Sequence, residues 1–109
     1  MWQAIVLGFL GGVMGGNAVP HFVRGITRRR YPNVMGSGPV PNVVAGWAGL
    51  VIAWLLLEPV AGGGHRGWAL GAAAAGVLVI GLFHAGPGAF GGKDPDPDRG
   101  RHEAAGAAS

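Results

Sequence analysis

Three apolar stretches with almost no charge dominate this chain and limit what it can fold into. They run from about Trp2 to Val19, from Val43 to Val60 and from Gly67 to Ala85. A helix on the surface of a water-soluble protein carries charged residues along its outer face, and these stretches do not. Each would form a helix of roughly 27 Å, close to the thickness of a bilayer core. Because backbone polar groups must bond one another in lipid, we expect an all-α membrane domain of three transmembrane helices over residues 1–90.

The first stretch has to be distinguished from a cleavable signal peptide. It is N-terminal and ends in small residues near Ala18. A signal peptide has positive charge before its apolar run, but no lysine or arginine precedes this one. Arginines follow it instead, beginning at Arg24, and positive charge behind an apolar segment resists translocation. We therefore expect a retained helix whose N-terminus lies outside the cytoplasm.

The basic side chains are distributed unevenly between the two sides of such a domain. With three spans, the first loop and the C-terminal tail share one side, and the other side has Arg66 alone. Cytoplasmic segments are enriched in lysine and arginine, which places the C-terminus in the cytoplasm of a bacterial plasma membrane. The isoelectric point near 10.7 then reports topology, and no nucleic-acid partner is expected. The seven basic residues on the predicted cytoplasmic side are Arg24, Arg28, Arg29, Arg30, Lys93, Arg99 and Arg101.

Glycine is frequent in these stretches, and its spacing indicates helix packing. Gly8, Gly12 and Gly16 are four residues apart. Gly11 and Gly15 repeat this spacing on a neighbouring face, and small residues so spaced let helix backbones approach closely in lipid. We expect them to hold the bundle together, with the second and third helices forming an antiparallel hairpin; the alternative is homo-oligomerisation through the first helix. The predicted packing residues are Gly8, Gly12, Gly16, Gly71 and Ala75.

The segment between the first two stretches, residues 20–42, contains arginines, prolines and aromatic residues. Pro20 is well placed to begin a short helix. Phe22 and Ile26 would share the apolar face of that helix with Arg24 opposite, as in helices that lie in the membrane interface. On this interpretation the loop is ordered and its arginines contact lipid headgroups; on the equally weighted alternative they only set the topology. The candidate headgroup contacts are Arg24, Arg28, Arg29 and Arg30.

Residues 16–32, GNAVPHFVRGITRRRYP, contain a short motif that a proline-rich turn and an asparagine follow. The residues that define it are Gly16, Asn17, Pro20, His21, Phe22, Gly25, Ile26, Thr27, Pro32 and Asn42. In this form the motif resembles one in a family of small, uncharacterised bacterial integral membrane proteins. The resemblance covers roughly the first half of the chain, and the later stretches match only in hydropathy. It implies the membrane architecture and no activity.

Three polar residues are expected to meet at the cytoplasmic ends of the helices. Asn17 and His21 are one helical turn apart, and His84 ends the third apolar stretch on the same side. Together they form a candidate interface site for a metal ion or a proton. Two histidines without a carboxylate or a third ligand are weak evidence for a metal, and such residues more often cap helix ends. We therefore predict no metal and no cofactor.

Enzymatic chemistry finds little support in the sequence. The chain has no cysteine, its only serines are Ser37 and Ser109, and no catalytic triad or phosphate-binding loop appears. In the tail, residues 91–109, three aspartates alternate with prolines, but the glycine and the closing glutamate of a calcium loop are not in place. We expect a disordered cytoplasmic tail and a protein that is not an enzyme.

Three functions fit these features. The first is a non-enzymatic structural or accessory protein that binds a membrane-protein partner or a second copy of itself. The second is a holin-like pore former, because small size, three spans and a charged tail are typical of that class. The third is a subunit of a transporter or channel, which the lack of an ionisable residue deep in any stretch disfavours. The proline-rich loop favours the first.

Overall fold

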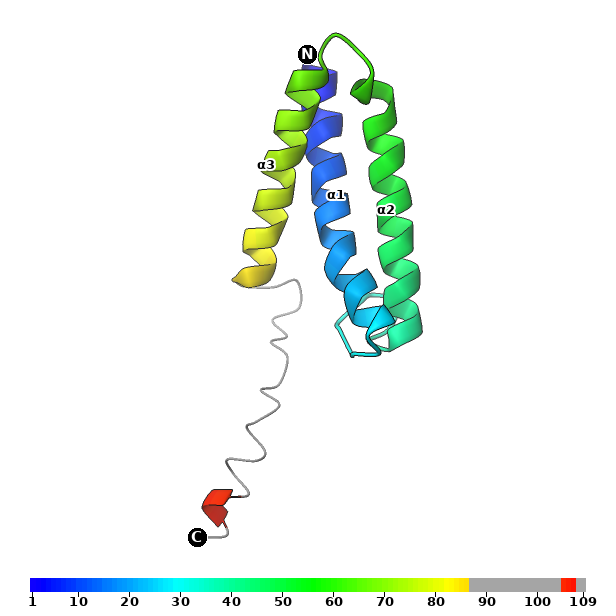
Figure 1. Ribbon diagram of the computed structural model, residues 1–109, viewed down its shortest axis with the longest axis vertical. Helices are drawn as coiled ribbons and strands as arrows, with labels where there is room; N and C mark the ends of the chain where they lie inside the picture. The colour runs from blue at the N-terminus through cyan, green and yellow to red at the C-terminus, as the bar shows by residue number, and fades with distance from the viewer. Residues whose placement is uncertain (87–104, 108–109) are drawn as a thin grey trace.

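The structure, a computed structural model, describes residues 1–86 and 105–107. It contains three long helices, α1 (Trp2–Ile26), α2 (Pro39–Ala61) and α3 (Arg66–Ala85), joined by a loop of residues 27–38 and a turn of residues 62–65 (Figure 1). At 1.5 Å per residue they are about 30–38 Å long, and each is long and apolar enough to cross a membrane. The predicted all-α fold with three membrane helices is therefore confirmed at the level of length and composition. The prediction for the tail, residues 91–109, lies almost entirely outside the described residues.

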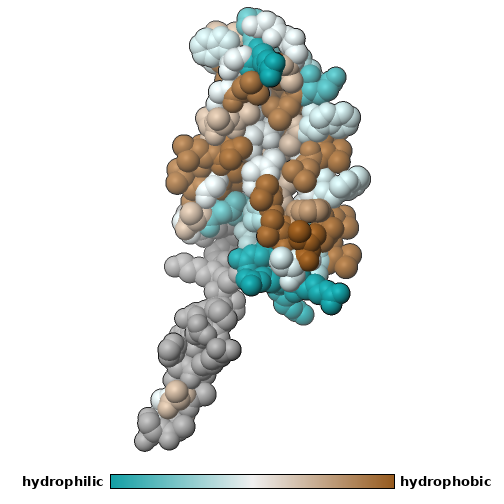
Figure 2. Space-filling model, viewed as in Figure 1, coloured by the Kyte–Doolittle hydropathy of each residue, from teal (hydrophilic) through white to brown (hydrophobic). Residues whose placement is uncertain are grey.

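Large apolar side chains lie on the outside of the helix bundle. All four tryptophans have more than half of their surface exposed: Trp2, Trp47, Trp54 and Trp68. The buried apolar residues of the described chain are small: Ala4, Ala18, Ala53, Val60 and Ala69. Figure 2 shows apolar residues over the helical body and hydrophilic residues mainly at its two ends. Lipid solvates such a surface and water does not, so the arrangement is that of a small multi-pass membrane protein.

α1 extends to Ile26 and does not end at Val19 as expected. Pro20 lies inside the helix and does not begin a separate interfacial helix, so the loop shortens from the expected 20–42 to residues 27–38. Proline removes one helical hydrogen bond, but packing on α2 holds the following turns in place. A Cβ on Gly46 would lie 2.6 Å from the Phe22 backbone, and one on Gly25 would lie 2.5 Å from Val43.

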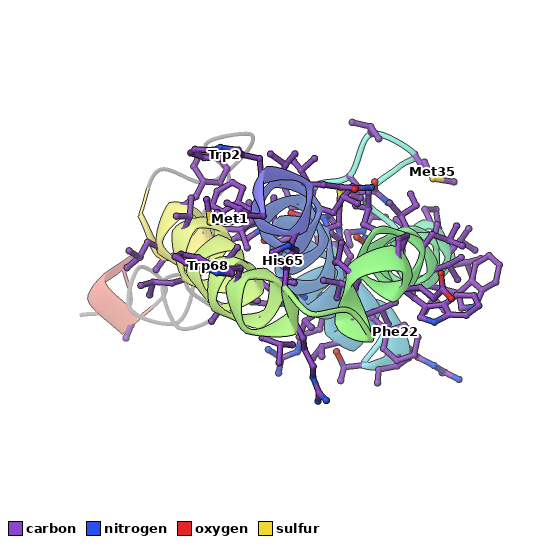
Figure 3. The ribbon with its side chains drawn as sticks, turned by 90° about the horizontal axis from the view of Figure 1, so that it is seen from above. Met1, Trp2, Phe22, Met35, His65 and Trp68 are labelled. Atoms are coloured by element: carbon purple, nitrogen blue, oxygen red, sulfur yellow. The ribbon has the colours of Figure 1, made fainter. Side chains whose placement is uncertain are left out.

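α1 lies between α2 and α3 and packs against both along its length (Figures 1 and 3). The other two helices follow each other in the chain and run in opposite directions, but they touch at few positions. The expected antiparallel arrangement of the second and third helices is therefore present, but the first helix lies between them and separates most of their length. The glycine-rich turn of residues 62–65 spans the distance between their ends.

One glycine stripe on α1 meets α3. A Cβ on Gly8 would overlap the carbonyl oxygen of Ala69, and one on Gly12 would overlap that of Ala73. The offset in both pairs is 61 residues (69 − 8 and 73 − 12), so the two helices run parallel with their backbones in contact. Gly76 of α3 approaches the α1 backbone in the same way. Only residues without a Cβ, or with the smallest side chains, permit this distance.

The second glycine stripe on α1 meets α2. A Cβ on Gly11 would lie 2.7 Å from the Leu57 side chain, and one on Gly15 would lie 3.5 Å from the Ala53 Cβ. The residue numbers now fall along α2 as they rise along α1, so these helices are antiparallel. Each stripe serves one neighbour, which explains why α1 occupies the centre of the bundle.

Gly71 and Ala75, two of the predicted packing residues, lie elsewhere. Both are exposed, and no atom of another helix lies within 4 Å of a Cβ built on Gly71. The face of α3 that contacts α1 contains Ala69, Ala73 and Gly76 instead. Small residues occur on opposite sides of α3, so spacing alone did not distinguish the side that meets α1.

Gly12→Ala and Gly15→Ala test this arrangement on adjacent faces of one helix. The methyl group at residue 12 would meet the Ala73 backbone, so this variant should lower the free energy of unfolding by about 1–3 kcal/mol. The methyl group at residue 15 would make an ordinary contact with Ala53, so that variant should be neutral or slightly stabilising. Denaturant titration in detergent micelles, followed by circular dichroism, measures both. Equal losses would contradict close packing of α1 on α3 at Gly12.

Candidate functional site

Polar side chains gather at the end of the bundle where α1 ends, α2 begins and α3 ends; this end, which includes residues 27–38, is called the loop end. α1 ends there in a tight turn in which the Arg28 N–H donates to the Gly25 carbonyl at 3.1 Å and the Arg29 N–H to the Arg24 carbonyl at 2.8 Å. These two bonds define a Schellman cap, whose left-handed residue is usually glycine. Arg28 takes that position with a φ of 56°. The turn therefore holds a basic side chain at a strained backbone position.

Asn42 lies at the centre of the loop end, and it is the largest side chain that the described residues bury completely. Its Nδ2 donates to the carbonyl oxygens of Tyr31 at 2.9 Å, Gly38 at 2.9 Å and Ser37 at 3.3 Å. The two hydrogens of one amide thus serve three carbonyl groups of the loop. Unpaired carbonyl groups are costly in an apolar environment, so Asn42 stabilises a loop that has few backbone hydrogen bonds of its own.

Asn42 also determines the orientation of His21. The Oδ1 atom of Asn42 lies 2.8 Å from Nδ1 of His21. Because the three carbonyl groups only accept, the amide nitrogen faces them and the oxygen faces the ring, so Nδ1 of His21 carries the proton. Nε2 of the neutral ring is then an acceptor, and among the described residues it has no hydrogen-bond partner. This atom is also accessible, since no side-chain nitrogen or oxygen in the described part is both buried and unpaired.

His84 connects α3 to the other elements at the loop end. Its Nε2 lies 2.8 Å from Oδ1 of Asn17, and its Nδ1 lies 3.1 Å from the Tyr31 hydroxyl. When Nε2–H donates to Asn17, the Tyr31 hydroxyl donates to Nδ1, which gives a continuous chain from the loop through α3 to α1. Tyr31 also meets the ring of His21 edge-on, with centroids 5.0 Å apart. One loop residue thus lies between the two histidines.

The structure places Asn17, His21 and His84 in one cluster, but it pairs them differently from a shared ligand site. Asn17 bonds His84, whereas His21 bonds Asn42. Sequence reasoning missed Tyr31 and Asn42 as members of this cluster. A polar residue at the edge of an apolar stretch was a usable signal for Asn42, while no spacing indicated Tyr31. Within the described residues, no three side chains that could hold a metal ion come together.

The four arginines predicted to contact headgroups all lie at the loop end. The Arg24 guanidinium lies over the Tyr31 ring, 5.7 Å from its centroid, and the arginines at positions 28–30 are exposed. Glu58 carries the only carboxylate side chain in residues 1–86, and it lies in α2 near the opposite end of the bundle. The exposed arginines at positions 28–30 therefore lie at the opposite end of the bundle from Glu58.

A groove of about 360 Å³ opens beside the polar cluster, between α1, α2 and the loop. Its polar lining residues are Asn17, His21 and Asn33. Most of the remaining lining is apolar and comprises Met14, Ala18, Val34, Met35, Ala45, Ala48 and Ile52. Figure 3 shows Met35 on the opposite side of the bundle from Phe22. The groove volume of about 360 Å³ is at the small end of the range for ligand sites.

Comparisons with protein-family models, with curated proteins and with solved structures find no match to the chain. The resemblance of residues 16–32 to a family of small bacterial membrane proteins therefore stays a prediction. The fold and the site define a class only: a small protein with three candidate membrane helices and a polar loop end.

Replacing Asn42 should destabilise the protein more than any other single polar substitution at the loop end. Asn42→Ala removes the side-chain donor from three carbonyl groups and leaves the Tyr31 carbonyl and the His21 N–H unpaired, so the free energy of unfolding should fall by at least about 2 kcal/mol. Asn42→Asp keeps the shape but removes both donors, and should also destabilise. Asn33→Ala, which removes two hydrogen bonds in the same loop, should cost about 1 kcal/mol. Circular dichroism during thermal denaturation ranks the three, and a tolerated Asn42→Asp would contradict the donor role.

Proposed function

We propose that this protein is a non-enzymatic accessory protein of the membrane that binds a partner helix along the outer face of α3. The observation that carries the proposal is a second face of small residues on α3, turned away from α1. Gly67, Gly71 and Ala74 lie on it at helical spacing, with Leu78 and Gly81 continuing the same side. All five are exposed, and nothing lies within 4 Å of a Cβ built on any of the three glycines.

The cost of glycine in a helix supports this interpretation. In water each interior glycine destabilises a helix by about 1 kcal/mol relative to alanine, and a glycine that faces lipid gains no packing in return. Small residues in membrane helices are typical of sites where another helix approaches closely. The opposite face of α3, with Ala69, Ala73 and Gly76, serves that purpose against α1 within this chain. We infer the same purpose for the outer face, with a helix from outside the chain.

The polar cluster favours binding over catalysis. Both ring nitrogens of His84 are engaged, and the Asn42 side chain uses all its donors on loop carbonyl groups. These residues hold the loop and the helix ends in place, which is a structural task. A catalytic site needs a nucleophile, an acid or a base that is poised for substrate. The proposal of a non-enzymatic role therefore agrees with how the cluster uses its polar atoms.

Gly71→Leu and Gly71→Ala separate the partner contact from the fold. Leucine should block the close approach of another helix and abolish co-purification of a partner from native membranes, whereas alanine should retain it. Both variants should keep the helicity and denaturation midpoint of the wild type, because the position is open within the chain. Two differently tagged copies of the protein, expressed together, distinguish a second copy from a different partner. Unchanged recovery of all partners with Gly71→Leu would contradict the proposal.

We also propose that the N-terminus lies outside the cytoplasm and the loop end inside. The distribution of basic residues supports this orientation, since the arginines at 24 and 28–30 share one end of the bundle and Arg66 lies at the other. The chain has no cysteine, so single cysteines can be labelled without background. In intact cells, a membrane-impermeant maleimide should label Gly63→Cys and not Ser37→Cys. Labelling of Ser37→Cys alone would reverse the orientation.

The holin and transporter hypotheses take second place. α1 meets both neighbours at backbone distance, so its glycine stripes are filled by helix contacts within one chain. The buried apolar core of the described residues contains no charged side chain that would mark an ion pathway. Neither hypothesis explains why the small residues on the outside of α3 are exposed.

A further inference from the structure

We infer that the groove at the loop end binds one acyl chain of an anionic phospholipid, whose phosphate lies among the arginines of that end. The inference goes beyond the proposed function and needs only insertion into a membrane. It requires neither a partner helix on α3 nor a particular orientation. Three observations support it: the shape of the groove, the unpaired polar atoms in its wall and the positive charge of the loop end.

The groove is elongated along the helices and changes in polarity along its length. Met14 and His21 are seven residues apart on α1, and Ala45 and Ile52 are seven residues apart on α2, which corresponds to about 10 Å of helix. Met14 and Ile52 line the part toward the middle of the bundle, and both are apolar. His21 and the loop residue Asn33 line the part at the loop end. A lipid has the same gradient, from acyl chain to ester and phosphate groups.

Two side chains in the groove wall have polar atoms that no described residue satisfies. Asn17 uses its Oδ1 for His84, which leaves its Nδ2–H groups available as donors. His21 uses Nδ1 for Asn42, which leaves Nε2 available. The ester and phosphate oxygens of a phospholipid accept hydrogen bonds from an amide donor.

The positive charge of the loop end favours an anionic headgroup. Arg24 lies over the ring of Tyr31, and that ring lies against His21 in the groove wall. The arginines at 28–30 extend the positive charge, while Glu58 lies at the far end of α2. The loop also exposes Val34 and Met35, as expected where a segment lies at the boundary of headgroups and hydrocarbon.

A second copy of this chain fits the groove less well than a lipid does. The groove extends over only about two helical turns, shorter than a helix–helix contact across the membrane. Two copies that met here would also bring their arginine-rich loop ends together. The arginines of the two copies would repel each other, whereas an anionic lipid neutralises their charge.

Native mass spectrometry of the purified full-length protein in detergent micelles tests the inference. The micelles contain phosphatidylglycerol and phosphatidylcholine in equal amounts, and retained lipid is counted for each protein variant. The wild type should retain phosphatidylglycerol in preference to phosphatidylcholine. Replacing Arg29 and Arg30 together by glutamine should reduce that preference by about tenfold, since each arginine near a headgroup contributes to the affinity. A wild type that retains both lipids equally would overturn the inference.

Ala48→Phe locates the bound lipid in the groove. The phenylalanine ring fills the space between α1 and α2, so phosphatidylglycerol retention should fall at least about tenfold. Val79→Phe adds bulk to an exposed position on α3 and should leave retention unchanged. Ala45→Leu is the milder second variant in case Ala48→Phe does not fold, as judged by circular dichroism. Full retention of phosphatidylglycerol by a folded Ala45→Leu or Ala48→Phe protein would overturn the site. A wild-type dimer that these variants dissociate without loss of bound lipid would also overturn it. Because no partner is present, none of these outcomes affects the proposal for α3.

Discussion

The contact of the α1 backbone with both neighbouring helices is the constraint on which the rest of the structure depends. Lipid tails are as apolar as leucine, so hydrophobic burial does not hold helices together in a membrane, and close packing has to do so. Glycine at positions 8 and 12 allows α3 to approach, and glycine at positions 11 and 15 allows α2 to approach. Because both faces of α1 are occupied, the other helices are kept apart. Their large side chains are then left to face outward, where lipid solvates them.

The two ends of the bundle are held by different forces. At the end that contains the N-terminus, a small apolar cluster of Ala4, Val60 and Ala69 joins all three helices. At the loop end, directed hydrogen bonds from Asn42 and His84 have this role. Hydrogen bonds strengthen in a low dielectric, and unpaired polar groups become costly there. These hydrogen bonds therefore fix the conformation of the loop as well as its position, and so they hold the arginines in place relative to the groove.

The sequence predicted the three helices well, because charge is excluded from segments that cross lipid whatever their neighbours are. It placed the end of α1 too early, since a proline normally interrupts a helix and only packing against Gly46 and Val43 shows why Pro20 does not. The double glycine stripe was visible, but spacing cannot assign a partner to each face. The same limit applies to α3, where Gly71 and Ala73 belong to similar patterns on opposite sides.

The polar cluster was only partly predictable for a related reason. Asn17, His21 and His84 could be placed at one end from helix length alone. Asn42 acts on backbone carbonyl groups, which every residue has, so no pairing of side-chain types in the sequence points to it. Asn42 stabilises the loop only when the loop follows the path that brings its carbonyl groups to the amide. The loop in turn needs these hydrogen bonds to keep that path.

The two open surfaces of this protein lie on different elements, and this limits how one could influence the other. The groove is bounded by α1, α2 and the loop, while the exposed small-residue face belongs to α3. Since α2 and α3 touch at few positions, the direct routes from the groove to α3 are the packing of α1 and the hydrogen bonds of His84 to Asn17 and Tyr31. The packed stripe on α1 has little freedom to move, because its backbone already contacts that of α3. The two hydrogen bonds of His84, one to Tyr31 of the loop and one to Asn17 of the groove wall, are therefore the more adjustable connections. A lipid that shifts the loop would act on the end of α3 and leave the glycine contacts in place.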